Sequence, residues 1–477
     1  MSEGATKKEE KPRKFQAIRG TRDLLPPETA LWNRVEQTAH QVFATFGFGE
    51  IRLPAVETLG LFARSLGAET DIVGKEMFLL AEREPSVVVH PGRFGPPPQS
   101  EQDRRDEVPP VFSEPSMRES VERQIAESVL VLRPEATASV CRAYIEHNMQ
   151  QMPQPVKLYY MGPMFRRERP QKGRYRQFYQ IGAEVLGGSD APAIDAEVIE
   201  MVMTFFDRLE LQGIQLDINS IGDRNCRPKY VELLRAELLK VKDKLGADSQ
   251  RRIETNPLRV LDSKLESEQP VIAKLPRIAD HLCEDCKTHY AEVKRQLDLR
   301  GVKYHENWRL VRGLDYYMRT TFEITAQGLG SQNAVCGGGR YDGLVELLGG
   351  PPTQGIGFAI GEDRLILSLQ ESGKAAAQQG RDVYIAWMGE RAQATGIRAA
   401  KDLRKAGFSV ELPSVEQKFG KALGQADKLG AKYALILGDN EVSEGLWTLK
   451  TLADGSQAKC TEPDLLEYLR KQRALSP

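Results

Sequence analysis

Cysteine and long apolar runs are scarce in this chain. It has 6 cysteines among 477 residues, scattered rather than spaced as a disulfide framework, which favours a reducing cytoplasm. No run of about 18 apolar residues occurs, so no membrane-spanning helix is expected. Residues 1–14 are charged and contain no apolar stretch, so we expect a disordered tail and no secretory signal.

An excess of either charge is also missing. Lys and Arg number 66 and Asp and Glu number 67, which gives a net charge of −1. This balance argues against a uniformly basic nucleic-acid binder, although a local basic patch stays open. Hydrophobic residues make up 40% of the chain, enough for several cores, and the length predicts about three domains.

A proline-rich stretch interrupts the regular patterns at residues 82–128. Eight prolines lie between Pro85 and Pro115, and strand-like segments flank the stretch at 77–80 and 129–132. This composition predicts a mobile insertion in a hairpin loop, with a binding role as the alternative.

The hydrophobic periodicity and turn residues of the remaining sequence predict the domain organisation. Before residue 54, helical periodicity from Leu31 to Phe46 is followed by a strand at 50–54. Strand, glycine-rich turn and helix signals fill 309–369, and the end of the chain alternates strands and helices, which predicts a small α/β domain with mainly parallel pairing. The expected divisions are a tail (1–14), a first core segment (15–222), an inserted helical module (223–305), a second core segment (306–370), a linker (371–380) and a C-terminal domain (381–477).

Residues 165–176, FRRERPQKGRYR, carry six cations against one acid, Glu168. Pro170 and Gly173 predict a loop between the strands that enter and leave it. Guanidinium groups held by a rigid sheet match phosphate oxygens, so the loop indicates a polyphosphate or nucleic-acid site. A solvated basic turn is the alternative.

Two glycine-rich segments follow later in the chain. Residues 336–350, CGGGRYDGLVELLGG, allow close backbone approach but match neither a P-loop nor a dinucleotide-binding fingerprint. Residues 355–361 lead from a strand into a helix with Arg364 in its first turn. A cation there opposes the helix dipole, which a strongly anionic ligand would offset.

Two polar segments complete the set. Residues 310–319, LVRGLDYYMR, place Arg312, Tyr316 and Tyr317 around a glycine. Residues 133–137, RPEAT, form a turn into a helix with Glu135 and Thr137 as polar ligands. Ordinary polar turns and tyrosine packing are the alternatives for both.

Together these segments resemble the histidyl-tRNA synthetases, a class II aminoacyl-tRNA synthetase family, from about Ile18 onward. The unit ending at Pro54 and the segments 160–186 and 355–365 resemble the three motifs that the class shares. Residues 310–319 and 336–343 resemble the two histidine-binding peptides of the family, and 18–23 resembles its usual opening. Two departures are Ala136, where a glycine is common, and the proline-rich insertion.

The resemblance implies the fold and the reaction. The fold would be an α+β catalytic core with a mainly antiparallel sheet of six or seven strands, an inserted helical module and a C-terminal α/β anticodon-binding domain. The chain would activate L-histidine with ATP and Mg²⁺ to histidyl-adenylate and pyrophosphate, and then transfer histidine to the 3′ end of tRNA(His). The resemblance further implies a cytoplasmic homodimer with no membrane association.

It also implies roles for single residues. Arg312 and Arg166 would be catalytic at the α-phosphate, and Arg364 would hold the γ-phosphate end of ATP. Residues carried over by motif complete the site: Glu168 and Arg174 for ATP; Glu135, Thr137, Gln180, Glu184, Tyr316, Tyr317, Tyr341 and Arg312 for histidine; and Arg169 and Gln171 for the tRNA acceptor end.

A tight group of possible metal ligands lies at His281, Cys283, Cys286 and His289. Structural zinc usually needs a second, separated pair of ligands. The four residues fall in an expected helix with a single CxxC pair, so we expect no protein-bound structural metal from them.

Two other classes of protein compete with the enzyme. A catalytically inactive relative of this fold, such as a regulatory subunit, typically loses the arginines or the anticodon domain, and this chain keeps both. A nucleic-acid-binding module without catalysis would explain residues 165–176 but not the two arginine–glycine segments.

Overall fold

The structure of the chain is a computed structural model that describes residues 15–66, 70, 72–80, 129–314, 316–327, 333–373 and 380–475. The expected tail at 1–14 and the proline-rich insertion at 82–128 lie outside the described residues. The chain forms two compact units, with the main division between residues 375 and 376. Among the described helices, none combines the length and the apolar character that crossing a bilayer requires.

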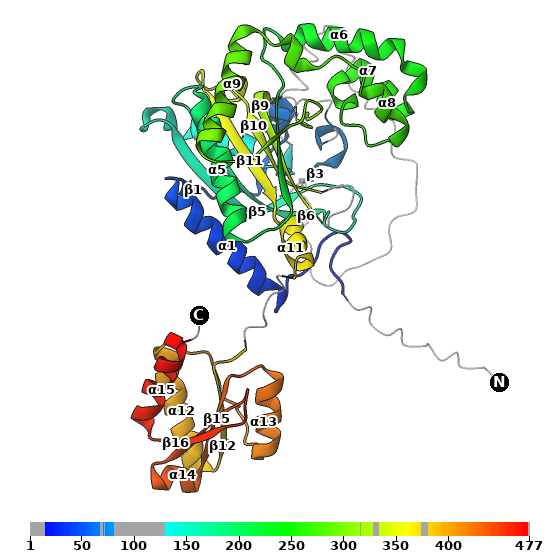
Figure 1. The fold of residues 1–477 in the computed structure, drawn as a ribbon. Helices are drawn as coiled ribbons and strands as arrows, with labels where there is room; N and C mark the ends of the chain where they lie inside the picture. The colour runs from blue at the N-terminus through cyan, green and yellow to red at the C-terminus, as the bar shows by residue number, and fades with distance from the viewer. Residues whose placement is uncertain are drawn as a thin grey trace, which may run out of the picture. The chain divides into compact units, whose positions relative to one another are not determined.

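A mixed sheet of eight strands forms the centre of the larger unit (Figure 1). Its strands in spatial order are β1 (Gly49–Glu50), β5 (Val156–Phe165), β6 (Gln177–Leu186), β11 (Gly355–Gly361), β10 (Ala334–Arg340), β9 (Met318–Ala326), β7 (Ile214–Ser220) and β8 (His305–Glu306). The six strands from β5 to β7 pair antiparallel, and the short β1 and β8 add in parallel at the two edges. The mainly antiparallel pairing is therefore confirmed, but the sheet has eight strands where the family resemblance implied six or seven.

The strand expected at 50–54 is shorter than predicted, because β1 comprises Gly49 and Glu50 and its contact with β5 ends at one further hydrogen bond, from the Ile51 N–H to the Tyr159 carbonyl at 2.8 Å. The Arg133 guanidinium donates instead to the carbonyls of Leu53 (2.7 Å) and Pro54 (3.1 Å). These carbonyls are satisfied by a side chain, so the backbone leaves the sheet before the proline.

Two helices, α1 (Glu28–Thr45) and α5 (Pro192–Arg208), cover one face of this sheet (Figure 1). Phe43 of α1 packs against Tyr159 of β5 at 5.4 Å between ring centroids and against Phe205 of α5 at 5.8 Å. Tyr160 points to the opposite face, where it joins the apolar cluster of α4 (Thr137–Glu146). Successive strand residues alternate between faces, so one face packs on helices and the other is free to build a site.

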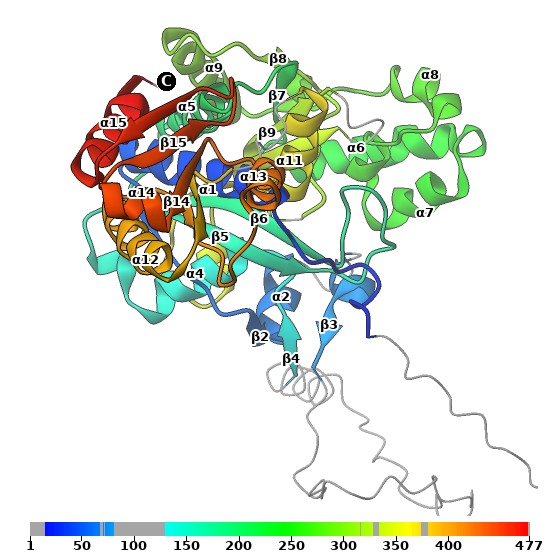
Figure 2. The same ribbon diagram turned by 90° about the horizontal axis from the view of Figure 1, so that it is seen from below.

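A second, three-stranded sheet has the order β2 (Val56–Thr58), β4 (Leu130–Leu132) and β3 (Phe78–Leu79) (Figure 2). Helix α2 (Leu59–Leu66) and the π-helical turn Ile72–Glu76 lie between β2 and β3 in the chain. Phe78 pairs with Leu132 in antiparallel register. The two segments that flank the proline-rich insertion are thus the arms of one hairpin, as predicted.

Helices dominate residues 223–305, as the sequence predicts. The α-helices are α6 (Arg227–Lys240), α7 (Ala247–Thr255), α8 (Gln269–Ile272) and α9 (Glu284–Leu299), and the 3₁₀ turns are Lys242–Lys244, Pro257–Val260, Glu266–Glu268 and Ile278–His281. Leu234, Ile253 and Ile272 bury their side chains in one apolar cluster. Helix α9 packs along α5, so the module ends against the helical face of the central sheet.

The glycines expected to form a turn at residues 336–340 lie instead inside strand β10. Gly337 belongs to a row of cross-strand partners with small side chains, in which Gly182, Ala359 and Gly337 lie side by side.

 The register pairs Gly182 with Ala359 and Ala359 with Gly337. A Cβ on Gly338 would lie 2.4 Å from the Gly357 carbonyl oxygen, so a larger residue would not fit at this position of the strand.

The smaller unit is a five-stranded sheet with helices on both faces. Its strands in spatial order are β13 (Val410–Glu411), β12 (Val383–Met388), β14 (Tyr433–Gly438), β15 (Trp447–Thr451) and β16 (Gln457–Cys460), and its helices are α12 (Glu390–Lys405), α13 (Phe419–Lys428), α14 (Asp439–Glu444) and α15 (Glu462–Leu475). The first three strands pair in parallel, but β14–β15 and β15–β16 are antiparallel. The expectation of mainly parallel pairing therefore holds for only half of this sheet.

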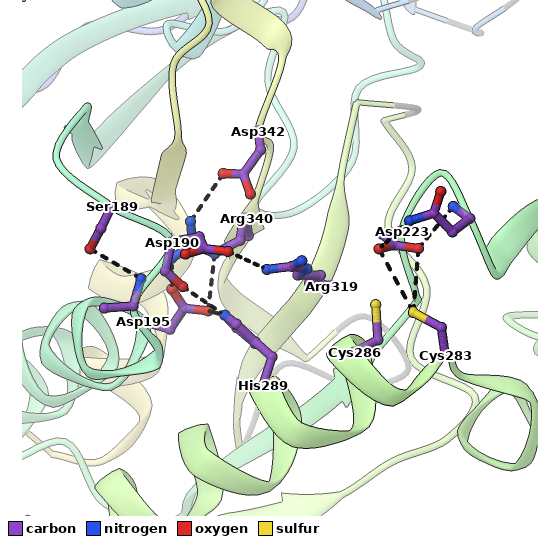
Figure 3. A network of polar contacts seen from close by, with 12 residues as sticks. Ser189, Asp190, Asp195, Asp223, Cys283, Cys286, His289, Arg319, Arg340 and Asp342 are labelled. Carbon is purple, nitrogen blue, oxygen red and sulfur yellow. Dashed lines mark hydrogen bonds and ion pairs between the residues drawn. The ribbon is translucent and has the colours of Figure 1, made fainter.

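A buried ionic network joins α5, α9, β9 and β10 in the larger unit (Figure 3). Arg340 is 1% exposed and forms an ion pair with the fully buried Asp195 of α5. The ring nitrogen Nε2 of His289 lies 3.7 Å from the same carboxylate and 3.1 Å from the Asp190 carbonyl oxygen. Arg319 donates to the Asp190 side chain at 2.8 Å. The network ties the last helix of the module to the sheet.

We expect Arg340→Met to lower the free energy of unfolding by about 3–5 kcal/mol, because it leaves the Asp195 carboxylate buried without its partner. Urea unfolding of the full chain measures the loss. Lys240→Ala is the control, since its ammonium pairs with Glu237 on the surface and such pairs contribute about 1 kcal/mol or less. An Arg340→Met variant as stable as this control would contradict the assigned role of the network.

Candidate active site

A cavity of about 430 Å³ opens on the face of the central sheet opposite α1 and α5. Its floor includes two members of the row of small residues described above, Ala359 and Gly337, and Tyr160 and Glu323 are also among its lining residues. Side chains longer than alanine at the middle of this row would fill the space. The sheet therefore provides a rigid and nearly bare base on which charged side chains from the surrounding loops converge.

One wall of the cavity is built at the start of α4. The Glu135 carboxylate accepts hydrogen bonds from the backbone N–H groups of Thr137 (2.7 Å) and Ala138 (3.0 Å). It thereby caps two free donors at the helix N-terminus, where negative charge is favourable. The Thr137 hydroxyl donates in turn to Glu184 at 2.7 Å.

Glu184 lies behind this wall and is 1% exposed. The Tyr341 hydroxyl donates to its other oxygen at 2.5 Å. Gly357, the cross-strand partner of Glu184, provides the space, because a Cβ there would lie 1.6 Å from the carboxylate. Burial raises the pKa of Glu184 to about 8, although the hydrogen bonds from Tyr341 and Thr137 act in the opposite direction.

Arginines line the cavity at the loop between β5 and β6 and at the start of α11 (Glu362–Glu371). Arg166 donates through Nε to the Pro134 carbonyl at 2.9 Å, and Arg174 donates to Glu168 at 3.2 Å. Arg364 donates to the Ala334 carbonyl at 2.9 Å. Burial lowers the pKa of Arg364, and the nearby Arg174 lowers it further. Cations that repel one another in a shared cavity favour an anionic ligand.

Arg312 lies over the glycine strand. Its Nη1 donates to Glu323 at 2.8 Å, and Glu323 is the cross-strand partner of Gly337. A Cβ on Gly337 would lie 2.0 Å from Nη2 of Arg312, so only glycine leaves room for the guanidinium. Nε of Arg312 and Oε1 of Gln180, both cavity residues, are buried without a hydrogen-bond partner within the part of the chain that the structure describes. A polar ligand could satisfy both atoms.

Three tyrosines form an aromatic group beside the carboxylates. The ring centroid of Tyr316 lies 4.7 Å from that of Tyr317 and 5.7 Å from that of Tyr341. Tyr316 and Tyr317 line the cavity, and the Arg312 guanidinium carbon lies 5.8 Å from the Tyr317 ring centroid. The cavity thus combines aromatic rings, acidic and amide groups, and several arginines.

Comparisons with known proteins agree with this architecture. A family model described as histidyl-tRNA synthetase matches residues 120–365, and a model described as an anticodon-binding domain matches residues 382–472. A relative named histidine–tRNA ligase from Koribacter versatilis is 49% identical over 96% of this chain and 97% of its own length. The chain belongs to the histidyl-tRNA synthetase family.

Two further relatives support the membership. A histidine–tRNA ligase from Solibacter usitatus is 49% identical over 95% of this chain and 99% of its own length. The crystal structure of an apo histidyl-tRNA synthetase from S. aureus is 34% identical, covers 96% of this chain and 100% of that chain, and superposes with a TM-score of 0.72. The resemblance inferred from the motifs is therefore confirmed for the whole synthetase architecture.

The structure brings together most residues that the synthetase motifs single out. The cavity is lined by Glu135, Thr137, Arg166, Glu168, Arg174, Gln180, Arg312, Tyr316, Tyr317 and Arg364. Glu184 and Tyr341 lie behind its wall, so they support the lining rather than form it. Arg169 and Gln171 are exposed on the loop between β5 and β6, outside the cavity. Asp315 lies outside the described residues.

Motif reasoning missed Glu323 and the role of the glycine row. Glu323 is the one acidic residue in the strand Met318–Ala326, and this isolated acid in an otherwise uncharged stretch after Arg319 was the available signal. The position of Gly337 beneath Arg312 follows only from strand register.

The four candidate metal ligands of the inserted helical module, His281, Cys283, Cys286 and His289, do not come together. The His281 ring packs on Tyr230 at 5.8 Å between centroids, and His289 belongs to the Asp195 network. Cys283 and Cys286 lie instead beside Asp223 and Cys226. The histidines are therefore separated from the cysteines by their own contacts.

A Glu184→Gln variant tests the protonation of the buried carboxyl. The raised folded-state pKa means that the contribution of Glu184 to stability is present below about pH 4.5 and is lost as pH rises through about 8. Glutamine has no such titration, so stability of the variant relative to wild type should increase between pH 5 and 8, by on the order of a few kcal/mol. Urea unfolding at a series of pH values measures the change.

The matched control is Glu346→Gln, because Glu346 is exposed on the same unit. Exposed substitutions change stability by about 0.5 kcal/mol or less. A constant stability difference between Glu184→Gln and wild type across this pH range would contradict the assigned burial effect.

Proposed function

We propose that the cavity binds histidine beside its carboxyl and tyrosine groups and binds ATP beside its arginines. The chain catalyses histidine–tRNA aminoacylation, as its family membership shows. The observation that carries the assignment of the site is the position of Arg312, which joins the aromatic group to the charged cavity while Glu323 holds its guanidinium.

In the first step, the carboxylate of histidine attacks the α-phosphate of ATP, and pyrophosphate leaves. Arg312 and Arg166 would neutralise charge that develops at the α-phosphate, and Arg364 would hold the γ-phosphate end. Glu168 holds Arg174 and so limits the positions that its guanidinium can take. Mg²⁺ would arrive on the phosphates as part of the substrate.

Histidine itself would be recognised by polar and aromatic groups. Glu135 and Thr137 offer oxygen atoms for the α-ammonium group, and Oε1 of Gln180, which has no hydrogen-bond partner among the described residues, offers another. Tyr316 and Tyr317 would surround the imidazole. Glu184 and Tyr341 would act as positioning residues, because their hydrogen bonds fix Thr137 and the aromatic wall. A site that hydrogen-bonds its substrate discriminates strongly against apolar analogues.

The second step transfers histidine from the adenylate to the 3′-terminal adenosine of tRNA, and AMP leaves. The exposed Arg169 and Gln171 support a role of the loop between β5 and β6 in contacting the acceptor end. The C-terminal unit would contact the anticodon, since its sequence matches an anticodon-binding family model. The homodimer and the cytoplasmic location stay predictions, and light scattering of the purified chain tests the first.

ATP–pyrophosphate exchange tests the proposal directly. The full chain should incorporate labelled pyrophosphate into ATP with histidine and with none of the other nineteen amino acids at comparable rates. This result would separate the enzyme from an inactive regulatory relative and from a nucleic-acid-binding module. The absence of exchange with histidine would contradict the proposed site.

Arg312→Ala should reduce the exchange rate by about 10²–10³-fold, because one preorganised charge at the transition state is lost. Arg309→Ala is the control, since Arg309 lies three residues away and contacts Gln269 outside the cavity. Near-wild-type turnover of Arg312→Ala, or an equal loss in both variants, would refute the role of Arg312.

A further inference from the structure

Four potential metal ligands meet at the base of the inserted module, away from the cavity. Asp223, Cys226, Cys283 and Cys286 each place one ligand atom so that all four atoms lie within 4.8 Å of one another. Figure 3 shows Asp223 facing the start of α9, where Cys283 precedes the helix and Cys286 lies in its first turn. The second pair of ligands that zinc usually requires is therefore present, but it comes from 60 residues earlier in the chain.

The distances fit a tetrahedral ion. Zinc–sulfur bonds of about 2.3 Å give a tetrahedron edge of about 3.8 Å. The sulfurs of Cys226 and Cys286 are 3.8 Å apart, and the Cys283 sulfur lies 3.8 Å and 3.9 Å from the two Asp223 oxygens. The Cys226 sulfur lies 3.3 Å from Asp223. Small side-chain movements, without a change of backbone, would bring all four atoms to one ion.

The surroundings also suit a bound cation with anionic ligands. Asp223, Cys226 and Cys286 are 7%, 6% and 0% exposed, so water is largely excluded from the group. Cys226 precedes the first residue of α6, and Cys283 precedes the first residue of α9. Two helix N-termini therefore face the ligands, and their dipoles stabilise the negative charge of thiolates.

We propose that Asp223, Cys226, Cys283 and Cys286 bind one Zn²⁺ ion that fastens the inserted module to the central sheet. Three thiolates and one carboxylate favour zinc over the hard cations Mg²⁺ and Ca²⁺. Each cysteine gives up its thiol proton to solvent when its sulfur binds the ion, and no electron is transferred.

The ion would close the module at its two connections. Asp223 and Cys226 stand between β7 and α6, where the chain leaves the sheet, and Cys283 and Cys286 begin α9, which leads back to β8. Arg227, the neighbour of Cys226, donates to the Tyr317 carbonyl at the wall of the cavity. The site would therefore hold the segment that supports the aromatic group, although it lies outside the reaction.

Metal analysis of the full chain tests the proposal. Reduced wild-type protein, supplied with zinc and then desalted, should hold about one zinc ion per chain, measured by inductively coupled plasma mass spectrometry. After exchange with cobalt, it should show the thiolate-to-cobalt absorption typical of sulfur ligands. Wild-type protein holding less than about a tenth of an equivalent would overturn the proposal, and this measurement needs no variant to fold.

Single variants then assign the ligands. Cys226→Ser and Cys283→Ser should lose most of the zinc and of the cobalt absorption, whereas Cys460→Ser, whose cysteine lies in the other unit, should keep both. Asp223→Asn keeps the side-chain shape and should bind zinc more weakly in competition with a chelator. Zinc retained in full by both cysteine variants would overturn the assignment.

Chelation separates binding from folding defects. Removing zinc from the wild-type chain should lower the melting temperature, and adding zinc back should restore it. A reduced, metal-free wild-type chain whose melting temperature does not change when zinc is added would contradict the proposal. The outcome is independent of the pyrophosphate-exchange test, because zinc content and melting temperature are measured without histidine, ATP or tRNA.

Discussion

The row of residues with little or no side chain across the central sheet is the constraint on which the site depends. Gly182, Ala359 and Gly337 are cross-strand neighbours, and the lack of a Cβ on the two glycines leaves room for the Tyr160 ring and the Arg312 guanidinium over the sheet. Arg312 can reach Glu323 only because Gly337 has no Cβ, and Glu184 can fold back only because Gly357 has none. The positions of the charged groups in the cavity thus depend on the absence of a Cβ at these glycines as well as on the charged side chains themselves.

Buried charge is the second feature that shapes this unit, and hydrogen bonding offsets its desolvation cost. Asp195 and Arg340 are almost fully buried but face each other, and His289 of α9 lies against the same carboxylate. Glu184 has two hydroxyl donors. These groups link the module, the helical face and the cavity wall, so removing one partner would disturb more than one element.

The sequence predicted regular elements well where the periodicity was strong. The strands entering and leaving the basic loop, the helix after Pro27 and the helical character of the module all follow from local patterns. Prediction failed where a distant group competed with the local pattern. Arg133 takes the carbonyls of Leu53 and Pro54 from the expected strand, and the glycines of β10 look like a turn because their strand neighbours are not visible in the sequence.

The sequence by itself determined the family, the antiparallel catalytic core, the C-terminal domain and the motif segments that supply most of the cavity lining, because each motif is contiguous in the chain. The tertiary structure alone decided which charges meet. It placed Glu323 against Arg312, moved Glu184 and Tyr341 behind the wall, and separated His281 and His289 from the cysteines. It also brought Asp223 and Cys226 to Cys283 and Cys286. Such pairs depend on strand register and helix packing between distant segments, and local sequence patterns carry no information about either.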